Sequence, residues 1–161
     1  MTKLLLAVHV VAAIITVGPV TVAASMFPAV ARRAQSQPDD GHPVAVMRTL
    51  HRISRVYAAL GVVVPVSGLV IAGSLHVLGD TWLIISIALT AIAAVILARL
   101  VLPRQSVILA SLDPAITVSS PVTEPTQRTA ARLAMHTGIF NLLWATVTVL
   151  MILRPGSTTG V

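Results

Sequence analysis

Five histidines are the side chains of this 161-residue sequence with the most evident capacity for chemistry. Four of them lie within or beside apolar segments: His9, His51, His76 and His136. Histidines that face each other on neighbouring helices can ligate b-type haem or copper. If the apolar segments are antiparallel helices, His9 comes near His76, and His51 comes near His136. The first pair is the better candidate for a cofactor site.

Two observations favour a structural role for the same histidines. His51 and His76 would lie about 38 Å apart along a helix, so two such sites would conduct electrons poorly. His51 also shares a helical face with three arginines, and His136 with two: Arg48, Arg52 and Arg55 for the first, Arg128 and Arg132 for the second. This pattern is typical of a basic surface that contacts lipid headgroups. An imidazole within a span, such as that of His9, can instead bond to a neighbouring helix.

Other kinds of chemistry have little support. The chain has no Cys, which excludes disulfides, thiolate metal sites and cysteine nucleophiles. None of its five acidic residues lies in an apolar segment, and this disfavours a proton-coupled transporter of small solutes. No phosphate loop, zinc-protease helix or serine nucleophile elbow is present. Asp39, Asp40 and His42 fall in a turn-rich segment that makes a poor metal site.

The composition of this sequence indicates a protein whose surface is mostly in contact with lipid. Hydrophobic residues make up 56% of the chain and charged residues 10%, with a mean hydropathy of +0.93. A soluble domain has about 25% charged residues. The net charge is +6, but the basic residues flank apolar segments and aromatic residues are only 3%, so nucleic acid is not an expected partner. All but one of the 11 basic residues are Arg, as in proteins from GC-rich bacterial genes.

Four apolar segments are long enough to cross a bilayer, which takes about 20 helical residues. They span residues 4–31, 56–78, 81–102 and 136–153. The sequence therefore predicts an all-α membrane protein, a single four-helix transmembrane bundle over residues 1–161. The first segment is too long for the apolar region of a signal peptide and is expected to remain as a helix.

Prolines and capping residues predict local features of these helices. Pro19 and Pro65 lie in the middle of the first and second spans and predict kinks. Pro43 predicts a short helix that continues into the second span on its cytoplasmic side. Thr123-Glu124-Pro125 predicts a similar extension before the fourth span. Arg99, near the end of the third span, is expected to reach the headgroups.

Small and polar residues predict where helices pack. Gly68 and Ala72 form a small pair in the second span, and a second stripe runs along the third span through Thr90, Ala94 and Ala98. Such stripes let helices approach closely in lipid. They fit packing within the bundle and packing against a partner subunit equally well. Asn141 is an expected donor of a hydrogen bond between helices.

Three short segments resemble a bacterial family of predicted integral membrane proteins without an assigned reaction. They are residues 3–13, which include His9, the pair Arg32-Arg33, and residues 150–155. That family is similar in four-helix layout to copper-resistance D-type proteins and to the membrane protoporphyrinogen oxidase of haem synthesis. The resemblance implies a histidine early in the first helix, and His9 matches it. Where those proteins have Trp-x-Gly-Gly, this chain has Thr16-Val17-Gly18-Pro19.

The function that the sequence favours is a non-catalytic accessory or scaffold subunit of a larger membrane assembly. The alternative is a redox or metal-handling protein that binds b-type haem or copper. The expected location is the bacterial inner membrane. The expected partners are the bilayer, anionic headgroups on the cytoplasmic side, and other membrane subunits or a second copy of the chain.

Charge distribution predicts the orientation. Nine basic residues lie in or beside the two long loops, and only Lys3 and Arg154 lie toward the termini. Basic loops stay in the cytoplasm. A reporter fused after Val161 should therefore be periplasmic, and one inserted near Asp40 should be cytoplasmic. Reporter activity on the opposite sides would contradict this topology.

Overall fold

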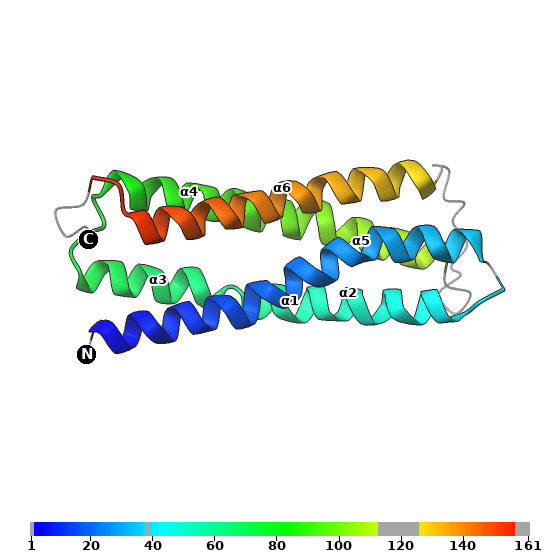
Figure 1. The fold of residues 1–161 in the computed structure, drawn as a ribbon, viewed down its shortest axis with the longest axis horizontal. Helices are drawn as coiled ribbons and strands as arrows, with labels where there is room; N and C mark the ends of the chain where they lie inside the picture. The colour runs from blue at the N-terminus through cyan, green and yellow to red at the C-terminus, as the bar shows by residue number, and fades with distance from the viewer. Residues whose placement is uncertain (1, 38, 113–125, 157–161) are drawn as a thin grey trace.

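The computed structural model describes residues 2–37, 39–112 and 126–156, and these form four antiparallel helical rods (Figure 1). The first rod is α1 (Thr2–Ser36), and the last is α6 (Thr126–Leu153). The second consists of α2 (His42–Leu60) and α3 (Val63–Ser74). The third consists of α4 (Thr81–Ile96), a π-helical turn η1 (Leu97–Val101) and α5 (Leu102–Leu112). The predicted all-α, four-helix architecture is confirmed.

The rods are longer than the predicted spans. Each rod contains one helical stretch long and apolar enough to cross a membrane: Leu4–Ser36, His42–Ser74, Thr81–Leu112 and Arg128–Leu153. A helix of 33 residues is about 50 Å long, whereas the hydrocarbon core is about 30 Å thick. The predicted extension before the second span is confirmed, with Pro43 in the first turn of α2. Thr123-Glu124-Pro125 lies outside the described residues.

Pro65 interrupts the regular α-helix of the second rod at Gly61, four residues upstream, as expected for a proline inside a helix. Its missing N–H leaves the carbonyl of Gly61 without the usual donor. The backbone N–H of Val64 donates to that carbonyl at 3.1 Å, and α2 ends and α3 begins around this tighter turn. α1, in contrast, is a single helix through both Pro19 and Pro28.

The third rod does not end at Leu102, and this prediction was wrong. The ring of Pro103 would clash with the carbonyl of Arg99 in a regular α-helix. The π-turn η1 comes directly before it, and within it the N–H of Leu102 bonds to the carbonyl of Leu97, five residues back. The wider turn changes the position of the carbonyls relative to the proline ring, so the helix continues to Leu112.

The second rod ends at Ser74, four residues earlier than predicted. His76 has a φ of 59°, and its N–H bonds to the carbonyl of Gly73. The N–H of Val77 bonds to the carbonyl of Ala72, and the Val77 side chain packs near Ala72. These contacts form a Schellman motif, in which a residue with a left-handed backbone ends a helix. His76 therefore lies in a turn with an exposed side chain.

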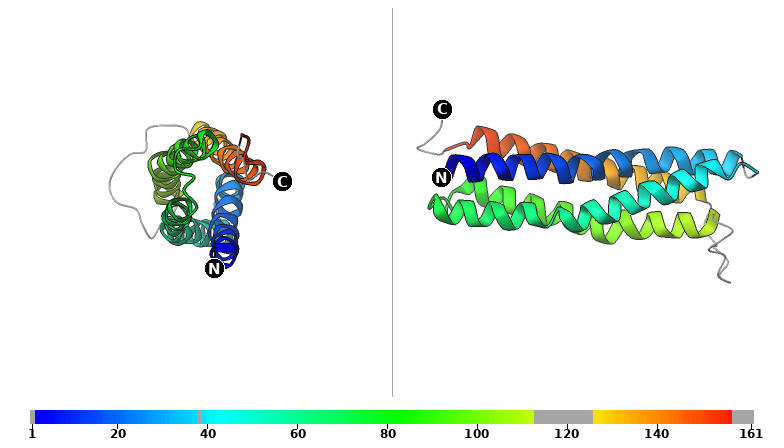
Figure 2. Two further views of the ribbon diagram at one scale, coloured as in Figure 1. Left: turned by 90° about the vertical axis from the view of Figure 1, so that its left-hand side faces the viewer. Right: turned by 90° about the horizontal axis from the view of Figure 1, so that it is seen from below.

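The rods form a ring (Figure 2), and α1 also contacts α5 across it. α1 packs on α2, α3 and α6, α4 packs on α6, and α2 packs on α5. The end of the bundle formed by α5 and the starts of α2 and α6 carries most of the arginines; we call it the basic end. The opposite end carries both termini, and we call it the terminal end (Figure 1).

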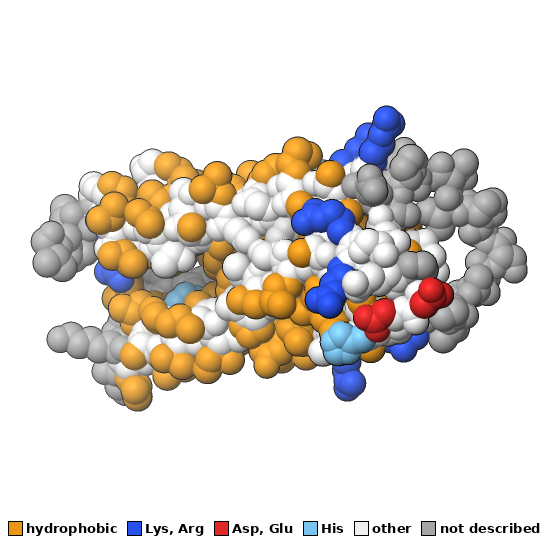
Figure 3. Space-filling view, turned by 45° about the vertical axis from the view of Figure 1, so that its right-hand side comes forward, with side chains coloured by type: hydrophobic (Ala, Val, Ile, Leu, Met, Phe, Trp, Pro, Cys, Tyr) orange, Lys and Arg blue, Asp and Glu red, His pale blue; other side chains and the backbone are white. Residues whose placement is uncertain are grey.

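The largest hydrophobic cluster extends from the middle of the rods toward the basic end. Its fully buried large side chains include Phe27, Met47, Val101, Ile108 and Leu133. A smaller cluster of Ala72, Trp82 and Leu83 lies at the terminal end, where the surface is visibly hollowed between the rods (Figure 3). The basic end is therefore the tightly packed part that can hold side chains in fixed positions.

The turn at His76 yields a prediction about stability. A left-handed backbone costs a β-branched residue about 1–2 kcal/mol and costs Gly almost nothing. Thermal unfolding in detergent should therefore show His76→Val less stable than the wild type by part of that amount, because His also bears some of the cost, with His76→Gly at least as stable as the wild type. A His76→Gly protein as unstable as His76→Val would show that the imidazole, and not the backbone conformation, is what the turn requires.

Candidate functional site

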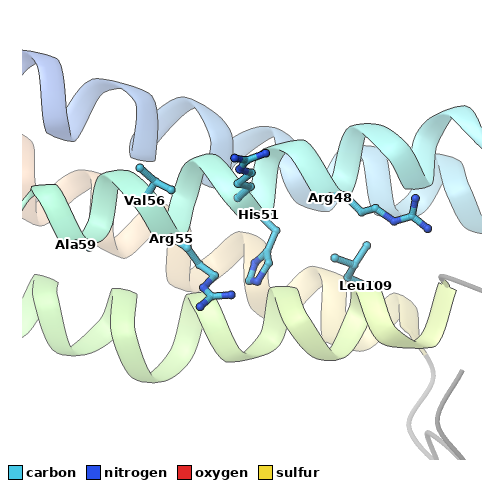
Figure 4. Close-up of a pocket in the computed structure, with 7 residues that line it drawn as sticks. Arg48, His51, Arg55, Val56, Ala59 and Leu109 are labelled. Atoms are coloured by element: carbon cyan, nitrogen blue, oxygen red, sulfur yellow. The ribbon is translucent and has the colours of Figure 1, made fainter. Parts of the chain in front are cut away.

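A groove between α2 and α5 contains the largest group of the predicted site residues (Figure 4). It consists of two adjoining cavities of about 400 and 330 Å³. His51 and Arg55 line both cavities, and they point from α2 toward α5 in Figure 4. The other lining residues are Arg48, Arg52, Val56, Ala59, Leu102, Pro103, Ser106 and Leu109.

A chain of polar side chains holds the two walls of this groove together. The Nδ1 atom of His51 lies 3.1 Å from Oε1 of Gln105, and Nε2 of Gln105 donates to Ser54 Oγ at 3.4 Å. An amide oxygen only accepts, so Nδ1 of His51 carries the hydrogen. Gln105 and Ser54 are fully buried. These bonds fix the spacing of α2 and α5 and leave Nε2 of His51 without a partner among the described residues.

The groove changes in chemistry along its length. Arg48, Arg52 and Arg55 follow one another along α2 from the basic end, and Val56 and Ala59 continue the wall toward the middle of the bundle. Leu102 and Pro103 line the opposite wall beside Arg55. In the part of the chain that the structure describes, no carboxylate lines the groove, and Arg52 and Arg55 are exposed and have no ion-pair partner.

His136 lies in a separate site on the other side of α5. Nη1 of Arg104 lies 2.7 Å from its Nδ1 and 3.1 Å from its Nε2. The Nδ1 atom also bonds to the carbonyl of Arg132 one turn earlier. Arg104 and Gln105 are consecutive and point in different directions, so α5 bonds to His136 on one side and to His51 on the other. The structure does not pair these histidines with each other.

The remaining basic residues form a belt around the basic end instead of a single face. Arg128 and Arg132 are exposed on α6, which is diagonal to α2 in the bundle. Arg99 is exposed on η1, as expected for a side chain that reaches the headgroups. In Figure 3 the blue side chains gather toward this end, and orange apolar side chains cover much of the rest.

His9 packs against α3 near the middle of its length. Its Nδ1 lies 2.8 Å from Ser67 Oγ, and that hydroxyl donates its own hydrogen to the carbonyl of Val64. Ser67 must then accept, so Nδ1 of His9 is the donor. A Cβ atom placed on Gly68 would lie 3.1 Å from Cε1 of the His9 ring. Gly68 therefore makes room for an imidazole ring.

His76 lies well away from the position that His9 contacts on α3. Ser67 and Gly68 precede it by about 12–14 Å along the helix axis, and His76 itself has turned away from that axis. Among the described residues there is no group of three His, Asp or Glu side chains placed to hold a metal ion.

The two small-residue stripes have different positions. Gly68 contacts His9, and Ala72 is buried in the cluster at the terminal end, so this pair serves the inside of the bundle. Ala94 and Ala98 are exposed, and Thr90 is half-buried. Asn141 donates to Ser25 Oγ on α1 at 2.9 Å, which confirms the predicted bond between helices.

Sequence reasoning missed Gln105, Ser54 and Ser67. Gln105 escaped notice because the third rod was expected to end at Leu102. Gln105 is the middle one of three consecutive polar residues, Arg104, Gln105 and Ser106, so its neighbours in the sequence do not indicate that it is the buried one. Ser67 directly precedes Gly68 in the sequence. A serine next to a glycine in one span indicates a hydrogen-bond partner for a histidine in a neighbouring span, because the glycine leaves room for the ring.

A comparison with protein families agrees with this architecture. The family described as predicted integral membrane protein (DUF2269) matches residues 3–155. The chain belongs to this family. A search of curated proteins and a search of solved structures found no match to it. This DUF2269 member is therefore a multi-pass integral membrane protein with four spans that contact lipid. A likeness to copper-resistance D-type proteins or to protoporphyrinogen oxidase stays a prediction.

The contact between His9 and Gly68 in this DUF2269 protein predicts that substitutions at Gly68 and at Val70 of α3 lower the stability to different extents. Gly68→Leu inserts a side chain into the space of the imidazole and should lower stability by about 1–3 kcal/mol. Val70→Leu is the matched control, because Val70 is exposed and should tolerate the change. Thermal unfolding in detergent measures both. Equal effects would show that the α1–α3 contact does not depend on a small residue at this position.

Proposed function

We propose that this protein is a non-catalytic accessory or scaffold subunit of a larger membrane assembly. In this proposal it lies in the bacterial cytoplasmic membrane, with its basic end toward the cytoplasm and anionic headgroups around its belt of arginines. The observation that carries the proposal is an exposed alanine surface on α4 and the start of η1. Ala91 and Ala94 on α4 and Ala98 in η1 lie at helical spacing, and all three are exposed.

Small residues are typical of contacts between membrane helices, because they let the backbones approach closely. The internal small pair, Gly68 and Ala72, is already used within the bundle. The exposed surface of α4 is thus available for a helix of another subunit or of a second copy.

The polar side chains of the interior support a structural role. His9 bonds to Ser67, His51 to Gln105, and Asn141 to Ser25, each across two rods. Each of these pairs directs a donor at a neighbouring helix, as groups that hold a bundle together do.

The test is the size of the complex purified in a mild detergent. The wild type should elute with partner subunits or as an oligomer, and the double variant Ala94→Leu/Ala98→Leu should elute as a smaller species. Ala145→Leu is the matched control, because Ala145 is an exposed alanine on α6. A wild type that is monomeric and alone in detergent and in lipid discs would contradict the proposal, as would equal dissociation by Ala145→Leu.

One observation favours a second candidate, a protein that binds haem or copper through His9. The Nδ1–H of His9 is held by Ser67, and Nε2 has no hydrogen-bond partner among the described residues. Histidines that ligate metals commonly have one nitrogen fixed in this way. Purification after expression with haem and copper supplied separates the candidates. A colourless, metal-free protein would exclude this one.

A further inference from the structure

We propose that the groove between α2 and α5 is a discrete binding site for one anionic phospholipid. The phosphate lies at Arg52 and Arg55, and an acyl chain follows the apolar part formed by Val56 and Ala59. This site goes beyond the general attraction of a basic belt to headgroups. It rests on the proposed placement of the basic end at one surface of the membrane.

The charges of the groove fit a phosphate group. Arg52 and Arg55 contribute two guanidinium groups about one helical turn apart, and each presents several N–H donors to phosphate oxygens. The Nδ1–H of His51 is used by Gln105, so the two arginines supply the donors to the phosphate and His51 holds the walls of the groove together. In the described part of the chain no carboxylate competes for these groups there.

The depth of the groove fits a phospholipid and not a ligand from the aqueous phase alone. Arg55 lies about 29 Å along the rod from Ser74 at 1.5 Å per residue, and the hydrocarbon core is about 30 Å thick. With Ser74 at one interface, Arg55 is therefore at the other. Val56 and Ala59 then lie at the depth of the acyl chains, directly below the arginines.

The groove is formed before a ligand arrives. The buried bonds from His51 to Gln105 and from Gln105 to Ser54 hold α2 beside α5. The wide π-turn η1 ends immediately before Leu102 and Pro103, which line the wall opposite Arg55. A site whose walls are fixed loses little entropy on binding. This distinguishes a stoichiometric lipid from the exchanging lipids that surround the belt.

Native mass spectrometry of the detergent-purified protein, with added phosphatidylglycerol or phosphatidylcholine, tests the proposal. The wild type should bind one phosphatidylglycerol in preference to further copies, and phosphatidylcholine weakly. Arg55→Gln and Arg52→Gln should each lower phosphatidylglycerol affinity at least about fivefold. Arg32→Gln makes the same charge change on exposed α1 outside the groove, and its affinity should stay close to that of the wild type.

A charge-neutral variant tests the apolar part. Ala59→Phe fills the groove at an exposed position and should lower phosphatidylglycerol affinity, whereas inorganic phosphate at equal concentration should not displace the lipid. Circular dichroism establishes that each variant is folded. Equal loss in Arg32→Gln, equal binding of phosphatidylcholine, normal binding by Ala59→Phe or displacement by phosphate would each overturn the lipid site. Neither membrane orientation nor subunit assembly affects this measurement, so a failure of the proposed function would leave its result intact.

Discussion

The need to satisfy every backbone hydrogen bond inside hydrocarbon is the constraint on which the rest of this structure depends. Water is absent there, and an unpaired N–H or carbonyl costs several kcal/mol. The chain therefore remains helical even where prolines oppose a regular helix. The tight turn before Pro65 provides Gly61 with a new donor, and the π-turn η1 accommodates Pro103. Each adjustment changes the direction or register of a rod and so determines which side chains meet beyond it.

The same absence of water explains how the interior polar side chains are arranged. A buried imidazole, amide or hydroxyl in lipid must bond to another group of the protein, because no solvent is present to satisfy it. His9 with Ser67, Gln105 with His51 and Ser54, and Asn141 Nδ2 with Ser25 form such bonds across different pairs of rods. The bonds of Gln105 also determine the width of the groove between α2 and α5. Hydrogen bonds that the bundle needs for its stability therefore also give this groove a fixed shape.

Much of the fold was predictable because its signals are local in the sequence. Apolar length identified four spans, and Pro43 identified the extension at the start of α2. The ends of the second and third rods were not predicted correctly. His76 adopts a left-handed backbone, a conformation that is found mainly at Gly. Pro103 is accommodated by a π-turn, and no residue type in the sequence predicts where such a turn forms. Both depend on hydrogen bonds that form only when the neighbouring turns are in place.

Composition and charge by themselves determined that this chain is a four-span membrane protein with one basic end, because hydrocarbon thickness and headgroup charge act on every segment alike. Which side chains meet was decided by tertiary structure. Periodicity places His51 on a face of its helix, but the register of α5 beyond η1 decides that Gln105 is its partner. Likewise, only packing separates the inward Gly68 from the outward Ala94, since a small residue looks the same in sequence on either side of a helix.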